Sequence, residues 1–192
     1  IHSGQILNPE LLDYITDLKV DENEKLSVIV IAWSQWSTTI FEALLKILPD
    51  FEDIDFQIIL WEKNMHFRDE FKKFPNVMAH DFVTQKRLWK ILKQVDIAIT
   101  RWGSTCLWEL NVFWIHSIII PLSSSAWDHQ NLNAKYFNEK FWSDIVDEKN
   151  NFEVELYRKI KKYKDLRKNW VNLDDFFKPL KVIEKQINES ID

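Results

Sequence analysis

The sequence predicts an α/β protein built on a doubly wound parallel sheet. Short apolar runs bounded by polar or turn residues alternate along the chain with segments whose apolar residues recur at helical spacing. This alternation is typical of a parallel sheet that helices cover on both faces. A length of 192 residues is enough to bury a substantial core, so we expect a single domain over residues 1–192.

The expected elements follow one another in a regular order. Pro9 suits the first position of a short helix, and apolar residues at Ile40, Leu44 and Leu48 repeat at helical spacing. The expected helices span residues 8–18, 37–48, 66–73, 86–94, 131–140, 152–163 and 178–191, and a further short helix begins near residue 104. The expected strands span residues 26–32, 56–60, 77–80, 97–100, 117–122 and 143–146. Because helices connect successive strands, those strands should run parallel.

Composition excludes several classes of protein. The single cysteine, Cys106, cannot form an internal disulfide, which agrees with a reducing cytoplasm. No apolar run approaches the length of a membrane span, and the net charge of −5 argues against nucleic acid as a general partner. The histidines at 2, 66, 80 and 116 are scattered without the spacing of metal ligands. We therefore expect a cytoplasmic protein without a metal site.

Polar residues gather at the ends of two neighbouring expected strands, within residues 97–134. The strand at 97–100 leads through Arg101 to Ser104 and Thr105, which are good N-cap residues for a helix. The free N–H groups of such a helix start favour phosphate. The second strand ends in three serines, and the residues DHQNLNA then open another helix. Ligands of open α/β sheets bind at the carboxyl ends of the strands, so we expect the ligand site here.

The motifs of this stretch resemble the donor-binding half of the glycosyltransferase family 28 enzymes. The motifs are R-x-G-S-T-x-x-x-E, an apolar strand that ends in proline, and D-H-Q-x-x-N-A. The resemblance runs from about Gly4 to the C-terminal helix and implies the Rossmann-like C-terminal half of a GT-B glycosyltransferase. It also implies that Glu109 hydrogen-bonds the ribose hydroxyls of a uridine nucleotide. From spacing alone, Glu109 would equally be a solvent-facing helix residue.

The resemblance implies a diphosphate site made by two loops. Ser34 and Gln35 would lie against the diphosphate, and Ser104 and Thr105 would support it from the opposite helix start. Arg101 is a further candidate for stabilising the charge of the departing diphosphate. The resemblance implies UDP-N-acetylglucosamine as the donor substrate. Because helix N-termini and such a cation can stabilise the diphosphate without a metal, we expect no cofactor.

The base and the sugar of the donor would lie at two other places. Phe82 and Val83 match the family position that borders the uracil, and a core strand end is the plainer interpretation of both. Gln130 and Asn133 match positions that border the sugar, with His129 beside them. An ordinary helix N-terminus capped by an aspartate would account for these three residues without a ligand.

The resemblance further implies an inverting transfer of N-acetylglucosamine from its UDP donor to a lipid-linked peptidoglycan precursor. Such a transfer needs a base for the acceptor hydroxyl, and no residue of this chain is a good candidate. In the resembled enzymes, an N-terminal domain absent from this sequence carries the acceptor site and the base. The chain, which begins at Ile1 rather than at a methionine, is thus expected to be a piece of a longer enzyme or a separate subunit.

The expected partners are a UDP-sugar, that N-terminal domain or subunit, and a lipid-linked acceptor at the membrane surface, with the protein peripheral on the inner face. A subunit that makes another glycan and a non-catalytic UDP-sugar-binding module are the alternatives. UDP-sugar 2-epimerases and natural-product glucosyltransferases share the fold, but their central motifs fit residues 100–109 less well.

Tryptophan occupies positions that favour glycine. The chain has 2 Gly and 10 Trp, whereas ordinary usage of about 7% would give roughly 13 glycines. The family's phosphate loop G-G-S-Q-G-A reads A-W-S-Q-W-S at residues 32–37. We hypothesise that the gene uses UGA for glycine and that translation as tryptophan produced the residues at 33, 36, 114, 127, 142 and 170. Trp89 and Trp108 lie inside helix patterns and fit true tryptophans.

Overall fold

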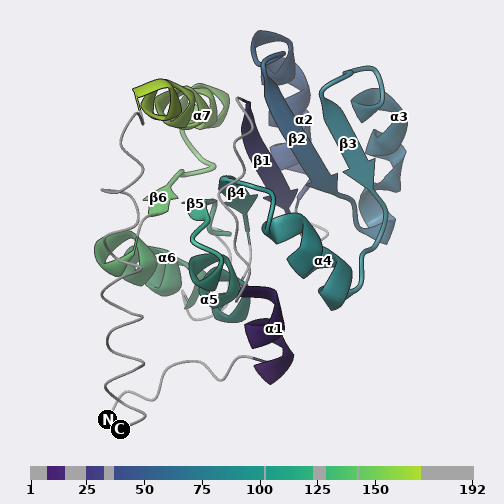
Figure 1. Ribbon diagram of the computed structural model, residues 1–192. Coiled ribbons are helices and arrows are strands. Elements are labelled where there is room, and N and C mark those ends of the chain that lie inside the picture. The colour runs from purple at the N-terminus through teal and green to yellow at the C-terminus, as the bar shows by residue number, and fades with distance from the viewer. Residues whose placement is uncertain are drawn as a thin grey trace, which may run out of the picture. The chain divides into compact units, whose positions relative to one another are not determined.

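Strands β1 to β6 form one sheet in the computed structural model, which describes residues 8–15, 25–32, 37–101, 103–122, 129–141 and 143–169. The strand order is β3-β2-β1-β4-β5-β6, and each pair of neighbours is parallel (Figure 1). This is the order of the doubly wound sheets that bind dinucleotides. The predicted fold class is therefore confirmed.

The observed strands match the expected ones closely. They are β1 (Leu26–Ile31), β2 (Ile54–Ile59), β3 (Val77–His80), β4 (Ile97–Thr100), β5 (His116–Ile119) and β6 (Ser143–Ile145). The bounds of β3 and β4 are those predicted, and β5 ends three residues before the predicted end at 122. The amide of Ile120 nevertheless still donates a hydrogen bond to the Thr100 carbonyl, at 2.8 Å.

The helices differ more from the prediction at their ends. They are α1 (Leu12–Ile15), α2 (Thr38–Ile47), α3 (Arg68–Phe71), α4 (Gln85–Leu92), α5 (Ser104–Val112), α6 (His129–Lys140) and α7 (Phe152–Asn169). Short 3-10 helices span Pro9–Leu11, Leu48–Asp50 and Glu62–Phe67, and the last of these runs directly into α3. α7 continues beyond its predicted end at 163, and the expected helix at 178–191 lies outside the described residues.

The chain divides into two compact units, Ile1–Lys159 and Ile160–Asp192. All the strands described above and α1 to α6 belong to the first unit, together with the start of α7. Of the second unit the structure describes residues 160–169, which form the end of α7. The ligand site predicted from the sequence falls wholly within the first unit.

An apolar layer lies between the sheet and helices α1, α4 and α5. It contains Ile29 and Ile31 of β1 together with Ala98 of β4. From the helices and the segments next to them it takes Leu11, Leu88, Trp89, Leu92, Val95, Cys106, Leu110, Phe113 and Ile115. Side chains alternate between faces along a strand, so Val28 and Val30 point to the opposite face, where they are equally buried. β1 is thus covered on both faces.

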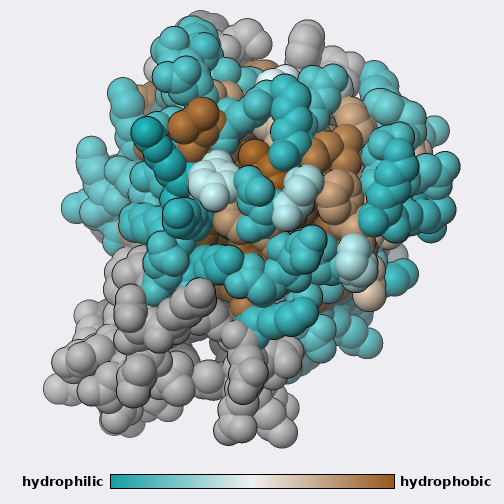
Figure 2. Space-filling view, turned by 90° about the horizontal axis from the view of Figure 1, so that it is seen from above, coloured by the Kyte–Doolittle hydropathy of each residue, from teal (hydrophilic) through white to brown (hydrophobic). Residues whose placement is uncertain are grey.

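Aromatic rings fill two further parts of the core. The ring of Phe41 on α2 packs against those of Phe67 and Phe71, with centroids 5.5 and 5.8 Å apart. Trp108 on α5 packs against Phe137 and Phe141 of the α6 region, at 5.2 and 5.1 Å. Figure 2 shows hydrophobic residues near the centre of the face seen from above, within a surround of hydrophilic ones.

Trp114 ends α5 in a backbone conformation that favours glycine. Its φ is 61°, in the left-handed region. The Trp114 N–H donates to the Asn111 carbonyl at 3.0 Å, and the Ile115 N–H donates to the Leu110 carbonyl at 3.0 Å. These two bonds make a Schellman motif with Trp114 at C′, where glycine is the usual residue. An L-residue at this C′ position carries a steric penalty, which agrees with the expectation that position 114 favours glycine.

The tryptophans of the helix interiors have a different environment. Trp89 is fully buried in α4, and its ring packs edge-on against Tyr14 with centroids 5.2 Å apart. Trp108 belongs to the aromatic cluster on α6 described above. Glycine at either position would leave a cavity in the middle of a helix. The remaining candidate positions, 33, 36, 127, 142 and 170, lie outside the described residues.

We expect opposite effects from two tryptophan-to-glycine substitutions. Trp114→Gly should raise the free energy of unfolding by about 1 kcal/mol, because glycine adopts positive φ without the clash of a Cβ. Trp89→Gly should lower it by at least roughly 3 kcal/mol, because it empties a packed core site. Urea denaturation followed by circular dichroism measures both. A loss of stability in Trp114→Gly comparable to that in Trp89→Gly would contradict the distinction.

Candidate functional site

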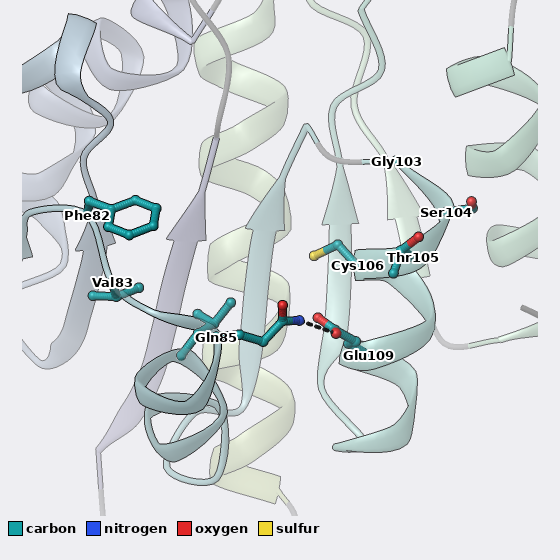
Figure 3. Close-up of a pocket in the computed structure, with 9 residues that line it drawn as sticks. Phe82, Val83, Gln85, Gly103, Ser104, Thr105, Cys106 and Glu109 are labelled. Carbon is teal, nitrogen blue, oxygen red and sulfur yellow. Dashed lines mark hydrogen bonds between the residues drawn. The ribbon is translucent and has the colours of Figure 1, made fainter. Parts of the chain in front are cut away.

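A pocket of 480 Å³ lies at the carboxyl end of the sheet (Figure 3). One wall comes from the loop after β3 and the start of α4, and the other from the first turns of α5, which follows β4. The lining residues are Phe82, Val83, Gln85, Leu88, Gly103, Ser104, Thr105, Cys106 and Glu109. The pocket therefore occupies the edge where ligands of doubly wound sheets bind.

The structure brings five of the predicted site residues together in this pocket. They are Phe82, Val83, Ser104, Thr105 and Glu109. The Phe82 side chain is 58% exposed, and its ring packs edge-on against Trp61 with centroids 5.4 Å apart. Figure 3 shows Phe82 and Val83 across the pocket from Ser104 and Thr105. The contacts of these residues with a nucleotide stay predictions.

The start of α5 differs by one residue from the prediction. Gly103, rather than Ser104 or Thr105, is the N-cap residue, with an extended backbone (φ −76°, ψ −178°). Glycine offers no side-chain oxygen, so Gly103 itself makes no side-chain cap at this helix start. A Cβ built at Gly103 would meet nothing within 4 Å, so open space adjoins this helix start. The geometry leaves the N-terminus of α5 able to bind an anion.

Glu109 is the carboxylate of the pocket among the described lining residues. It is 3% exposed, and the Gln85 Nε2 donates a hydrogen bond to its Oε1 at 2.5 Å. The Trp89 indole N–H is buried and makes no hydrogen bond of normal geometry with a described residue. Burial raises the pKa of Glu109, and the nearby Trp89 indole and the hydrogen bond from Gln85 oppose that rise. The carboxylate is thus desolvated and held by a neutral donor.

Cys106 lies one turn before Glu109 and is buried. Burial raises the pKa of the Cys106 thiol well above its usual range, and the Glu109 carboxylate raises it further. A thiol in such surroundings stays protonated and is a poor nucleophile. Cys106 is thus a small buried residue of α5.

Arg101 lies outside the set of described residues that line the pocket. Its side chain is 1% exposed, and its guanidinium pairs with Glu148 at 2.6 Å. Glu148 follows β6, so the ion pair joins the end of β4 to the loop after β6. The structure therefore gives Arg101 a carboxylate partner within the protein.

The other predicted site residues are placed only in part. Ser34 and Gln35 lie outside the described residues. His129 and Gln130 begin α6, but the structure does not describe their side chains. Asn133, one turn along α6, is half-buried and is not among the described lining residues. Their approach to a donor sugar stays a prediction.

Sequence reasoning missed Gln85. The residue lies 24 positions before Glu109 and meets it only because α4 and α5 pack side by side. The sequence did contain one sign of this position. Gln85 stands four residues before the apolar Trp89, so a helix would place both on the same face.

Two absences hold for the described part of the chain. No three histidine, cysteine or acidic side chains gather there as metal ligands. No helix in that part is both long and apolar enough to cross a bilayer.

Comparison with known proteins gives a consistent result. Residues 27–178 match the model of the glycosyltransferase family 28 C-terminal domain. Among curated proteins, the UDP-N-acetylglucosamine-N-acetylmuramyl-(pentapeptide) pyrophosphoryl-undecaprenol N-acetylglucosamine transferase of Prochlorococcus marinus (strain NATL1A) is 32% identical over 141 residues. That match covers 71% of this chain and 39% of the relative. The protein of the same name from Thermosipho melanesiensis is 27% identical and covers 93% of this chain and 50% of the relative. The chain thus spans half or less of these relatives.

Solved structures share the fold. The MurG crystal structure from Acinetobacter baumannii superposes with a TM-score of 0.65 at 16% identity, over 85% of this chain and 48% of that one. The UDP-GlcNAc 2-epimerase from Neisseria meningitidis, bound to UDP-GlcNAc, gives a TM-score of 0.57 at 12% identity, over 93% of this chain and 52% of that one. At these identities the likeness concerns the fold alone.

Ionised Glu109 should reduce the stability of the folded chain. Because burial raises its pKa above the ordinary value of 4.5, the unfolded state loses its proton first as the pH rises. The free energy of unfolding therefore falls from about pH 4.5 up to the folded pKa and stays lower above it. Glu109→Gln should thus stabilise the chain at pH 7 and lose that advantage below pH 4.5.

Urea denaturation at pH 7 and pH 4 measures the difference. Glu42→Gln, at an exposed position of α2, serves as the matched control and should change little at either pH. An advantage of Glu109→Gln that is the same at both pH values would show that the carboxylate charge is not its cause.

Proposed function

Because the chain belongs to the glycosyltransferase family 28 C-terminal domain family, we propose that it is the donor-binding half of an inverting N-acetylglucosaminyltransferase. The donor would be UDP-N-acetylglucosamine, and the acceptor a lipid-linked peptidoglycan precursor, as the names of the relatives indicate. The observation that carries the proposal is the buried, hydrogen-bonded Glu109 carboxylate in a pocket beside a helix N-terminus. A carboxylate accepts hydrogen bonds from a ribose diol, and the helix start favours the adjoining phosphates.

Each part of the donor has a proposed place. The ribose would lie against Glu109, and the uracil beside Phe82 and Val83 at the opposite wall. The diphosphate would lie at the start of α5, near Ser104 and Thr105. This arrangement follows from the family resemblance, and the grouping of these five residues around one pocket supports it.

The loops that would complete the donor site carry the remaining predicted residues. Ser34 and Gln35, after β1, would close on the diphosphate. Gln130 and Asn133 of α6 would border the sugar, together with His129 at the start of the helix. Both loops follow strands adjacent to β4, so they leave the sheet at the edge where the pocket lies.

Arg101 would bind the diphosphate only by releasing Glu148. Its guanidinium is buried against Glu148, 2.6 Å away, and breaking a buried ion pair is costly unless another anion replaces the carboxylate. A diphosphate is such an anion. We therefore assign Arg101 first to the support of the loop after β6, and to the diphosphate only if Glu148 moves.

The acceptor half of the reaction requires another domain. Among the described lining residues, Glu109 would be used by the ribose, and the thiol of Cys106 is protonated. No residue there suits the base that an acceptor hydroxyl needs. The chain spans 39% and 50% of two relatives that carry the transferase name. We propose that an N-terminal domain or subunit supplies the base and the acceptor site, at the inner face of the cell membrane.

The missing base favours one alternative, a module that binds UDP-sugars without catalysis. A separate catalytic subunit of a two-chain transferase for another glycan would have the same site. The neighbouring gene sequence distinguishes these cases, because it shows whether an acceptor domain is encoded beside this one. The same DNA gives the codon behind each tryptophan.

The recoding hypothesis bears on which polypeptide binds the donor. We propose that glycine is the native residue at positions 33, 36, 114, 127, 142 and 170, and the positive φ of Trp114 supports this for one of them. Two of these positions flank Ser34 and Gln35, where an indole would take up space that the phosphates need. Binding experiments therefore require both the chain as written and its form with glycine at these six positions.

We expect the glycine form to bind UDP, and Glu109→Ala to weaken that binding by roughly 1 to 3 kcal/mol through loss of charge-assisted ribose contacts. Isothermal titration calorimetry measures both affinities, and Glu42→Ala is the control for loss of a carboxylate elsewhere. Equal affinity in the wild type and in Glu109→Ala would remove Glu109 from the donor site.

The chain alone should transfer no N-acetylglucosamine to a lipid-linked acceptor, and it should gain this activity when joined to an N-terminal domain of the family. Transfer of radiolabelled sugar from UDP-N-acetylglucosamine to a lipid-linked precursor measures the activity. Turnover by the isolated chain at a rate similar to that of the joined protein would refute the half-enzyme proposal.

A further inference from the structure

Helix α4 directs the Gln85 amide at the carboxylate of Glu109. Gln85 and Trp89 are four residues apart, so both lie on one face of α4. The Gln85 amide reaches the Glu109 Oε1 at 2.5 Å, across the gap between α4 and α5 (Figure 3). The Trp89 indole is fully buried in the core on the same face of α4, and its N–H makes no hydrogen bond of normal geometry with a described residue.

Trp89 and Gln85 differ in burial and position. Trp89 is fully buried and packs against Tyr14, so its indole is fixed by the core. Gln85 is exposed as a residue and lines the pocket, although the carboxylate that it holds is only 3% exposed. An amide in this place both covers the carboxylate and faces any ligand in the pocket.

We propose that Gln85 is a positioning residue for donor binding, which fixes the Glu109 carboxylate so that it can accept the hydroxyls of a nucleotide ribose. The inference rests on the proposed function, because it takes the ligand to be a uridine nucleotide. Gln85 would act through Glu109, and its loss would leave the carboxylate free to turn about its side-chain torsions. Orientation of this kind is what supporting residues contribute to a binding site.

Gln85 also favours the charged form of the carboxylate. Burial raises the pKa of Glu109, and the hydrogen bond from Gln85 lowers it. Gln85 and Trp89, which affect the pKa of Glu109 from α4, are neutral. Cys106, one turn before Glu109 on α5, is titratable and lies beside the carboxylate. Without the Gln85 donor, protonation of Glu109 should begin at a higher pH, and so should the loss of ribose binding.

Gln85→Met tests the inference, because methionine keeps the length of the side chain and removes the donor. The variant is made in whichever form of the chain binds UDP. We expect a roughly tenfold loss of UDP affinity by calorimetry at pH 7, since hydrogen bonds to charged groups are worth more than neutral ones. The pH below which UDP binding is lost should also move upward. Gln94→Met, at an exposed position just after α4, is the matched control and should leave both unchanged.

Two further measurements separate positioning from a general loss of structure. In the Glu109→Ala background, Gln85→Met should weaken UDP binding no further, because the group that it positions is gone. Without any ligand, the ¹³C resonance of the Glu109 carboxyl should titrate at a higher pH in Gln85→Met than in the wild type or Gln94→Met.

The outcomes are distinguishable. Wild-type titration of Glu109 and wild-type UDP affinity in Gln85→Met would overturn this inference and leave the proposed function intact. Absence of UDP binding by both forms of the wild-type chain would overturn the proposed function, and with it the role of Gln85 in donor binding.

Discussion

The parallel pairing of β1 with both β2 and β4 is the constraint on which the rest of the structure depends. Val28 of β1 faces Phe56 on one side and Ile97 on the other, so the chain winds outward to β3 and then returns across β1 to continue in the opposite direction. In open α/β sheets, such a reversal of winding direction marks the place where ligands bind. Because all the strands are parallel, the loops after β3 and β4 open at the same edge, and this is where the pocket lies.

The buried Glu109 carboxylate has a stability cost, and in the proposed function it also has a binding advantage. A buried carboxylate is harder to ionise, and the desolvation that raises the pKa of Glu109 opposes folding at neutral pH. The same desolvation strengthens each hydrogen bond that the carboxylate accepts from a ligand. The Gln85 amide of α4 reduces the cost of ionising Glu109. It brings no positive charge that would compete with a ligand for the carboxylate. Sites that trade stability for function in this way are common in natural proteins.

The parts of the fold that depend on local pattern were predictable from the sequence. The bounds of β3 and β4 followed from short apolar runs between turn residues. Pairings between distant segments were not predictable, because no local pattern records them. The Gln85–Glu109 hydrogen bond depends on the packing of α4 against α5, and Arg101 meets Glu148 only because β6 lies two strands from β4. For that reason the sequence indicated Arg101 for the ligand, whereas the structure pairs it within the protein.

The described tryptophans separate by backbone conformation and packing, and this bears on the glycine deficit. The Schellman motif does not need the indole of Trp114. It is made by backbone N–H groups and by the apolar pair Leu110 and Ile115. The position thus tolerates tryptophan at a cost and would accept glycine without one. At Trp89 the relation is reversed, because the ring fills the core. A single rule that replaced every tryptophan by glycine would therefore empty a packed core site. If the gene does use UGA for glycine, the physical argument requires a tryptophan codon at position 89.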